Sequence, residues 1–257
     1  MEPKEPKGRI IVALDVDNPE KAITIVEQLR DHVGLFKVGL QLIYAIFAGL
    51  VSIPTEDVAV SNLRISRRLF GLLKGKLFLD GKFHDIPNTM AGVSAEVAKI
   101  EPVMFNLHVS ADIEAMMAAV AKKGNSKVLG VTVLTSLSGE ICQLIYGDTP
   151  GAKVLQFARD AKLAGIDGLI CSPQEITLLR GQKELKGMLL ATPGVRPAWA
   201  AKGDQARTET PGGAIEAGAD YLVIGRPITN PPPEIGTPVD AAKKIAEEIA
   251  TALAGRK

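Results

Sequence analysis

The chain has 257 residues, of which 46% are hydrophobic, 4% aromatic and 23% charged. This composition is typical of a globular protein and excludes collagen-like, mucin-like and largely disordered chains. The formal net charge of +1 excludes a broad field that would attract nucleic acid or an acidic membrane surface, so any anion site must be local.

The N-terminal segment MEPKEPKGRI contains no apolar signal core, and we expect residues 1–8 to form a flexible tail. The longest apolar stretch, residues 42–54, is shorter than the roughly 20 residues that a helix needs to cross a bilayer. Cys142 and Cys171 are too few for a disulfide framework and lack metal-ligand spacing. These features predict a cytoplasmic protein without a membrane partner.

From residue 10 onward, short β-rich runs alternate with longer helical stretches. The runs are almost continuously apolar, as in parallel strands that are covered on both faces. Asn18-Pro19 predicts the capped start of the first helix, over residues 19–32. Further helices are expected over residues 111–123, 151–164 and 239–254. The expected strands cover residues 10–15, 35–38, 76–80, 103–108, 127–132, 168–170, 188–192 and 221–225.

About eight β/α units with no Ser/Gly-rich linker predict one α/β domain over residues 1–257, a (β/α)8 TIM barrel. A doubly wound sheet would need fewer strands or a second domain. The stretch 42–75 is too long for one crossover helix and is broken at Ser52-Ile53-Pro54. We therefore expect an enlarged second β/α crossover that contains an extra helix.

Charged residues occur at the carboxyl ends of several expected strands, where the active residues of this barrel class lie. A buried charge must be paired, because it otherwise costs several kcal/mol, so an alternating acid–base cluster is expected at the barrel mouth. The charged residues at these ends are Asp15, Lys37, Asp80, Lys82, Asp85, Arg196 and Arg226.

Asp80 and Lys82 are two residues apart on one expected strand, so their side chains point to the same face. Asp85 follows in the loop, within possible reach of Lys82 or of a neighbouring site. Two interpretations remain open, a structural ion-pair cluster and a preorganised lysine that donates a proton. The spacing does not decide between them.

A phosphate site is predicted at the loops after the last two strands, where barrels often bind phosphate. TPGVRP (residues 192–197) follows the seventh strand, and YLVIGRPIT (residues 221–229) contains the eighth. Gly225 lets backbone N–H groups approach an anion, and Arg226 adds a bidentate contact unless it is only a surface arginine. Gln205 lies in the long loop after the seventh strand and is placed to fold over a ligand.

The three histidines show no metal-ligand spacing, so a metal site is not indicated. His84, between Lys82 and Asp85, either acts in catalysis or orients the loop. The sequence contains neither GxGxxG nor GxxxxGK[ST], which leaves dinucleotide and P-loop chemistry without support.

The run FLDGKFHDIPNT (residues 78–89) resembles the signature of the orotidine 5'-monophosphate decarboxylase family, Asp-x-Lys-x-x-Asp followed by Ile-Pro-Asn-Thr. The resemblance covers almost the whole chain. It implies decarboxylation of orotidine 5'-monophosphate to UMP and carbon dioxide, the last step of de novo pyrimidine biosynthesis, without metal or cofactor. Further similar segments are ALDVD at residues 13–17, FKVGLQL at 36–42, VTVLTS at 131–136, TPGVRP at 192–197, GDQ at 203–205 and VIGRPIT at 223–229.

The resemblance also implies a role for each matching residue. Lys82 would protonate C6 of the pyrimidine, and Asp80 would lie near the substrate carboxylate. Lys37 and Asp85 would complete the charge network. Asp85, Ile86 and Thr89 would reach into the site of a second subunit in a homodimer. The implied substrate contacts are Asp15 to the ribose, Thr135 and Ser136 to the pyrimidine, and Arg196, Gln205, Gly225 and Arg226 to the phosphate.

Three features depart from the family pattern. Gly81 stands where the family usually has a larger apolar residue, and we expect a packing defect there rather than lost chemistry. The crossover over residues 44–75 is longer than usual, and HVSAD (residues 108–112) replaces a HASGG-like run.

Two rival functions are compatible with part of this pattern. A sugar-phosphate decarboxylase or aldolase of the same superfamily shares Asp-x-Lys-x-x-Asp but uses magnesium and an acidic ligand after the second strand, where this chain has Lys37. A catalytically silent barrel that binds a nucleotide monophosphate as sensor or scaffold is supported only by Gly81 and the long crossover. Binding without turnover would identify the silent barrel.

Overall fold

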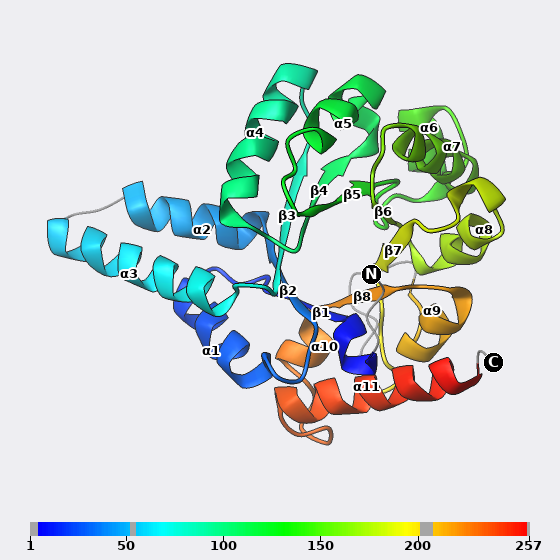
Figure 1. Ribbon diagram of the computed structural model, residues 1–257. Coiled ribbons are helices and arrows are strands. Elements are labelled where there is room, and N and C mark those ends of the chain that lie inside the picture. The colour runs from blue at the N-terminus through cyan, green and yellow to red at the C-terminus, as the bar shows by residue number, and fades with distance from the viewer. Residues whose placement is uncertain (1–4, 52–54, 201–207, 256–257) are drawn as a thin grey trace.

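The computed structural model describes residues 5–51, 55–200 and 208–255. Within these residues, eight parallel strands pair in chain order, and β8 pairs with β1 to close a barrel surrounded by helices (Figure 1). The predicted (β/α)8 TIM barrel is confirmed. Its strands are β1 (Ile10–Ala13), β2 (Leu35–Gly39), β3 (Leu77–Phe83), β4 (Met104–His108), β5 (Lys127–Val131), β6 (Gly168–Ile170), β7 (Leu189–Thr192) and β8 (Tyr221–Ile224).

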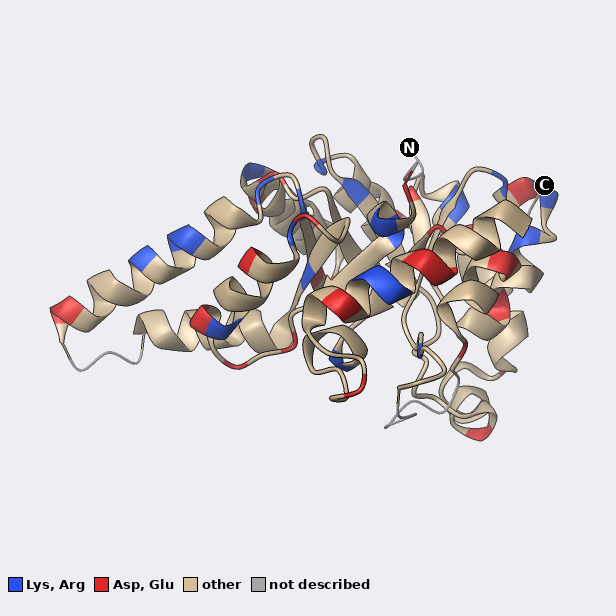
Figure 2. Cartoon of the chain, turned by 90° about the horizontal axis from the view of Figure 1, so that it is seen from below, with Lys and Arg blue, Asp and Glu red and all other residues tan. Residues whose placement is uncertain are grey.

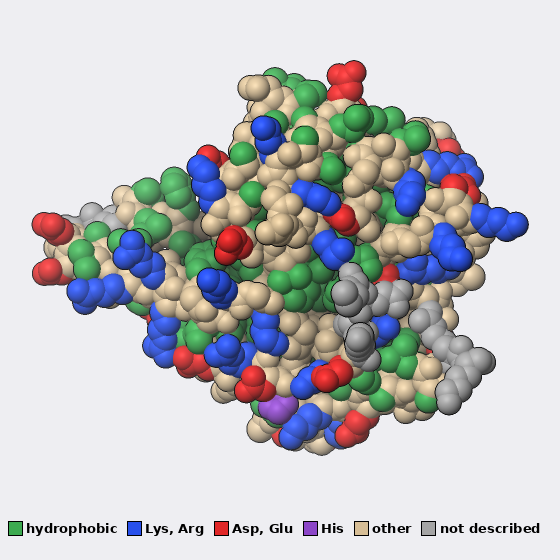
Figure 3. Space-filling view, viewed as in Figure 1, with side chains coloured by type: hydrophobic (Ala, Val, Ile, Leu, Met, Phe, Trp, Pro, Cys, Tyr) green, Lys and Arg blue, Asp and Glu red, His purple; other side chains and the backbone are tan. Residues whose placement is uncertain are grey.

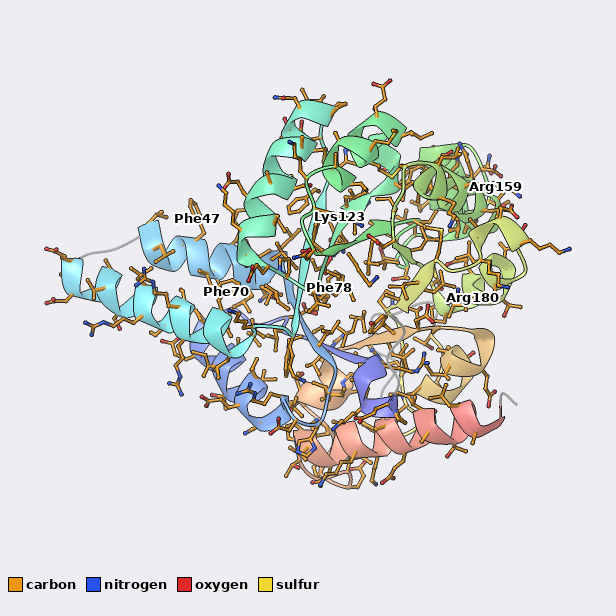
Figure 4. The ribbon with its side chains drawn as sticks, viewed as in Figure 1. Phe47, Phe70, Phe78, Lys123, Arg159 and Arg180 are labelled. Atoms are coloured by element: carbon orange, nitrogen blue, oxygen red, sulfur yellow. The ribbon has the colours of Figure 1, made fainter. Side chains whose placement is uncertain are left out.

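The strands are apolar throughout because both of their faces are covered. In β1, Ile11 and Ala13 belong to the cluster inside the barrel, whereas Ile10 and Val12 belong to the larger cluster between the strands and the helices. This alternation follows from the two-residue period of a strand. Phe78 of β3 lies at the centre of the inner cluster (Figure 4).

Helices cover the outer face of the barrel, and their ends carry the expected caps. The Asn18 side chain accepts the backbone N–H groups of Glu20 and Lys21 at the start of the first helix, as predicted. The helices are α1 (Pro19–Leu29), α2 (Leu40–Val51), α3 (Glu56–Leu72), α4 (Pro87–Ile100), α5 (Ile113–Val120), α6 (Gly139–Tyr146), α7 (Pro150–Leu163), α8 (Ile176–Arg180), α9 (Pro211–Ala217), α10 (Arg226–Thr229) and α11 (Pro238–Gly255). Short 3-10 helices are η1 (Pro6–Arg9), η2 (Val109–Ala111), η3 (Pro173–Glu175) and η4 (Lys183–Leu185).

Basic and acidic residues alternate along α11 and are spread over the other helices (Figure 2). This mixture agrees with the near-zero net charge. Among the described residues, no helix is both long enough and apolar enough to cross a membrane.

The second crossover contains two helices, α2 and α3, that lie side by side and project from the barrel (Figure 1). The Asn62 side chain of α3 donates a hydrogen bond to the carbonyl of Gly49 in α2 at 2.6 Å. The expected extra helix is therefore present.

The outer surface of α2 exposes large apolar side chains at helical spacing. Leu40, Tyr44, Phe47 and Val51 are between 47% and 65% exposed, and we call these four residues the α2 stripe. Hydrophobic side chains gather over this projection in the space-filling view (Figure 3), and Phe47 points away from the barrel (Figure 4).

Two segments differ from the sequence expectations. The helix expected over residues 111–123 begins only at Ile113, because Asp112 leaves the helical conformation (φ 80°) and its side chain caps the backbone N–H of Ala115. Within the tail expected over residues 1–8, η1 begins at Pro6. Arg9 is buried at its end and donates a hydrogen bond to the carbonyl of Asp220.

The amino ends of the strands are joined by ion pairs. Lys123 contacts Asp167 at 2.5 Å, and Arg180 contacts Asp220 at 2.6 Å (Figure 4). These pairs lie at the end of the barrel opposite to the carboxyl ends of the strands, so we expect them to contribute to stability rather than to a site at the barrel mouth.

Candidate active site

A cavity of about 500 Å³ opens at the carboxyl ends of the strands. Such a volume suits a small organic ligand. Most of the predicted site residues line it, namely Asp15, Lys37, Asp80, Lys82, Thr135, Arg196, Gly225 and Arg226.

Four charged residues form an unbroken row of alternating sign along one side of this cavity. Lys37 lies 3.0 Å from Asp15 Oδ1 and 3.0 Å from Asp80 Oδ2, and Lys82 lies 2.6 Å from Asp80 Oδ1. We call Asp15, Lys37, Asp80 and Lys82 the charge row. It is the acid–base cluster that the sequence predicts, and each buried charge in it has an opposite neighbour.

The row fixes the charge state of its buried members. Burial alone would raise the pKa of Asp80, but Lys37 and Lys82 outweigh burial and hold this pKa at about 2. Burial would likewise lower the pKa of Lys37, but the carboxylates of Asp80 and Asp15 outweigh it and raise this pKa. At neutral pH both groups are therefore charged, although their side chains are only 6% and 12% exposed.

The third strand is longer than expected because it continues through the charged motif to Phe83. Its pairing with β4 shifts in register between Leu79 and Phe83, and Lys82 has a left-handed backbone (φ 48°). This bulge places the Asp80 and Lys82 side chains in contact at the cavity.

Asn106 of β4 is a residue that the sequence reasoning missed. Its side-chain nitrogen donates to Asp80 Oδ1 at 2.6 Å, and its side-chain oxygen accepts the backbone N–H of Lys82 at 2.8 Å. The available signal was an amide in the middle of the apolar run 103–108.

The packing defect expected at Gly81 is not seen. A Cβ atom built on Gly81 would lie 2.5 Å from Cε1 of Phe83, so the Phe83 ring occupies the space of the missing side chain. That ring also packs near Phe105, with 6.1 Å between the ring centroids. The glycine is accommodated by its neighbour rather than left as a gap.

We expect Gly81→Ala to destabilise the protein by about 1–3 kcal/mol, because the added methyl group displaces the Phe83 ring. In Gly81→Ala/Phe83→Leu the cost should be smaller than the sum of the two single changes. Urea unfolding measures these differences. Gly92→Ala is the control, since a Cβ there meets nothing within 4 Å and α4 gains a better helix former. Equal stability of Gly81→Ala and the unchanged protein would contradict the steric account.

The predicted phosphate site lies across the barrel from β3. Arg196 follows β7, and Gly225 and Arg226 follow β8, and all three line the cavity together with Thr229. Arg226 is exposed and also lines the cavity, as the predicted phosphate contact requires. Gln205 lies outside the described residues.

Four predicted residues do not line this cavity within the single chain. Asp85, Ile86 and Thr89 are exposed around the start of α4, where Asp85 Oδ1 accepts the backbone N–H of Ile86. Ser136 is also exposed, next to Thr135, which does line the cavity. The chain therefore brings together the charge row and the arginines, but not Asp85.

His84 and His108 lie beside the charge row, with 5.9 Å between their ring centroids. Burial, together with His84 and Lys82, lowers the pKa of His108, so its imidazole is neutral at neutral pH. Neither ring lines the cavity. In the part of the chain that the structure describes, no three His, Cys, Asp or Glu side chains gather as metal ligands.

Comparison with known proteins gives one consistent family. Residues 8–245 match the model of the orotidine 5'-phosphate decarboxylase / HUMPS family. The orotidine 5'-phosphate decarboxylase of Heliobacterium modesticaldum is 41% identical over 264 residues, which cover 98% of this chain and 100% of the relative. The enzyme of the same name from Syntrophomonas wolfei is 40% identical, with 94% and 97% covered.

Solved structures give the same result. The crystal structure of orotidine 5'-phosphate decarboxylase from Lactobacillus acidophilus superimposes with a TM-score of 0.71 at 31% identity, and 93% of this chain and 98% of that chain are covered. The structure of the enzyme from Pyrococcus horikoshii has a TM-score of 0.70 at 26% identity, with 94% and 99% covered.

Proposed function

The chain belongs to the orotidine 5'-phosphate decarboxylase / HUMPS family, and we propose that its charge row decarboxylates orotidine 5'-monophosphate without metal or cofactor. Decarboxylation of this nucleotide in pyrimidine biosynthesis follows from the family and from the relatives. The finer mechanism rests on one observation, the contacts of 3.0, 3.0 and 2.6 Å that join the row from Asp15 to Lys82.

The reaction needs a fixed positive charge next to C6 of the pyrimidine. When the bond from C6 to the carboxylate breaks, the electron pair stays on C6 in an orbital that the ring delocalises poorly. The Lys82 ammonium, held by Asp80, stabilises this charge without reorganising and then gives its proton to C6. UMP and carbon dioxide leave, and the Lys82 amine regains a proton from water.

The other side chains of the row hold Lys82 and the substrate in place. Lys37 links Asp80 to Asp15, which binds the ribose hydroxyls, while Asp80 lies beside the substrate carboxylate. A carboxylate in that place disfavours the charged substrate relative to the neutral carbon dioxide that leaves.

The remaining contacts bind the parts of the nucleotide that do not react. Thr135 and Ser136 contact the pyrimidine. Arg196, Gln205, Gly225 and Arg226 bind the phosphate, and the binding energy of this remote group is used to order the site.

We further propose a homodimer in which Asp85, Ile86 and Thr89 enter the partner's site. Ile86 is 66% exposed and leads into α4, directly after β3. The α2 stripe starts directly after the neighbouring strand β2. The stripe and the segment of Asp85 and Ile86 therefore both follow the carboxyl ends of adjacent strands, on one rim of the barrel. A second copy of the chain would cover this apolar rim and supply the missing Asp85.

Mixing two inactive variants tests the shared site. Lys82→Ala and Asp85→Ala should each be inactive, and subunits mixed by co-refolding should regain up to about a quarter of the normal activity, because half of the dimers then carry one intact site. Lys82→Ala mixed with Asp80→Asn is the control. Each of these changes alters the cavity of the chain that carries it, so no intact site forms in a mixed dimer. Failure of the first mixture to regain activity would contradict the exchange of Asp85.

The ultraviolet absorbance change of orotidine 5'-monophosphate, followed in excess EDTA, tests the reaction itself. Turnover in EDTA supports the metal-free mechanism. Activity that EDTA removes and magnesium restores would support the metal-dependent rival, although Lys37 stands where that rival has an acidic ligand. A rise in melting temperature with UMP but no turnover would support the silent nucleotide binder.

A further inference from the structure

Asn106 is a fully buried amide in a strand that is otherwise largely apolar. Its exposed fraction is 0%, and burying an amide costs free energy unless its polar atoms are hydrogen-bonded. Met104, two residues earlier in β4, belongs to the cluster inside the barrel, so Asn106 also faces the interior. Both polar atoms of this amide are directed at β3.

The amide oxygen supports the bulge that carries Lys82. Leu79 of β3 pairs with Phe105 and Phe83 pairs with Leu107, so four steps along β3 match two steps along β4. The regular ladder is interrupted between these pairs, and the Asn106 oxygen accepts the Lys82 backbone N–H at 2.8 Å. A left-handed backbone costs a residue other than glycine about 1–2 kcal/mol, and this hydrogen bond offsets part of that cost.

The amide nitrogen fixes the rotation of the Asp80 carboxylate. It donates at 2.6 Å to Oδ1, the oxygen that also contacts the Lys82 ammonium at 2.6 Å. Oδ2 is thereby left for Lys37, at 3.0 Å. Without the amide, the carboxylate could rotate away from this arrangement, and the Lys82 backbone would lose its anchor.

We propose that Asn106 is a positioning residue that sets the geometry between the Lys82 ammonium and the Asp80 carboxylate. It is not a catalytic residue, because its side chain does not line the cavity. This inference rests on the proposed decarboxylation and extends it to a residue in the adjacent strand.

The chemistry of the site makes two substitutions informative. Asn106→Leu keeps the size and removes both hydrogen bonds. Asn106→Asp keeps an acceptor for Lys82, but its second oxygen can donate to Asp80 only while the new carboxyl is protonated. Burial and the adjacent charge of Asp80 raise the pKa of that carboxyl, whereas Lys82 and Lys37 oppose the rise. His108, two residues further along β4, is the other titratable group on this strand.

We expect Asn106→Leu to lower kcat about 100-fold, as for a displacement of the reacting groups by about 1 Å. KM and the affinity for UMP should stay within about threefold of normal, because the arginines at the phosphate site are untouched. Ser126→Ala is the matched control. Ser126 is also buried, and its hydroxyl donates to the Pro102 carbonyl at the opposite end of the barrel, so its loss should lower the melting temperature but not kcat.

For Asn106→Asp, kcat relative to the unchanged protein should rise at least about tenfold as the pH falls from about 8 to about 5, because protonation restores the donor to Asp80. The same ratio for Asn106→Leu should not change with pH. A general loss of packing would not produce this difference, and Asn106→Leu, which keeps His108 and adds no carboxyl, is the reference for any pH dependence that does not come from the new group.

The outcomes separate this inference from the proposed function. No turnover by the unchanged protein would overturn both. Normal turnover by the unchanged protein and by Asn106→Leu would overturn the positioning role alone. A parallel loss of kcat, UMP affinity and melting temperature in both Asn106 variants, with no pH difference between them, would show a structural role and also overturn it.

Discussion

Lys82→Ala is expected to lower kcat/KM for orotidine 5'-monophosphate by about 10⁴-fold or more, because in the proposed mechanism one change removes both the proton donor and the fixed charge next to C6. Neither Lys37 nor an arginine can replace it. Lys37 is held between Asp15 and Asp80 at 3.0 Å from each, and Arg196 follows β7 across the barrel.

The Lys82→Ala protein should still bind UMP, since the residues proposed to contact the phosphate and the ribose lie at the ends of other strands. Isothermal titration with UMP, beside the absorbance assay, separates lost chemistry from lost binding. Lys76→Ala is a matched control, because Lys76 directly precedes β3 at the amino end of that strand. The Lys76 ammonium donates to the carbonyl of Val33 at 2.9 Å, far from the cavity lining, so kcat should not change. Turnover by Lys82→Ala within tenfold of normal would contradict the mechanism.

Asp80→Asn should cost both activity and stability. Among the carboxylates of the described residues, Asp80 is the one that contacts both lysines of the charge row, so its neutralisation leaves two ammonium groups facing each other. We expect a loss in kcat of about 10³-fold and a loss in the free energy of unfolding of about 3 kcal/mol, as for a broken buried ion pair. Asp220→Asn is the matched control. It breaks an equally buried pair with Arg180 at the amino ends of the strands, and should lower stability without lowering kcat.

The pH dependence of stability gives a second measure of Asp80→Asn. The pKa of Asp80 is lowered from 3.8 to about 2 in the folded protein. The ionised carboxylate therefore stabilises the fold fully at a pH above the ordinary pKa of 3.8, and this contribution is lost as the pH falls through about 2. Urea unfolding between about pH 5 and about pH 2 should therefore show a shallower loss of stability for Asp80→Asn than for the unchanged protein. Equal slopes would indicate that the pKa of Asp80 is not depressed.

The sequence predicted the barrel and most of the charge row because both follow from short-range patterns. Apolar runs indicate strands, and the carboxyl ends of parallel strands meet at one rim, so Asp15, Lys37 and Asp80 had to converge. The long crossover was recognised from its length and its proline.

The bulge in β3 and the role of Asn106 could not be predicted in this way. They depend on the register between two strands, and a polar residue in an apolar run does not reveal which neighbour it contacts. The expected strand ended at Asp80, whereas in the structure the hydrogen bond from Lys82 to Asn106 and the pairing of Phe83 with Leu107 carry it to Phe83. In the proposed homodimer the place of Asp85 depends on a second chain, and within the single chain Asp85 does not line the cavity.

The closure of the barrel by its first and last strands has a consequence for synthesis. β1 pairs with β2 and with β8, and the buried Arg9 is bonded to the carbonyl of Asp220, directly before β8. A ribosome releases β1 long before β8, so one edge of the nascent sheet stays open until the final strand emerges. Contacts of such high sequence separation also slow folding. The growing chain therefore carries an unpaired strand edge for most of its synthesis. Such an edge can pair with another chain, so we expect chaperone binding to matter most during this period.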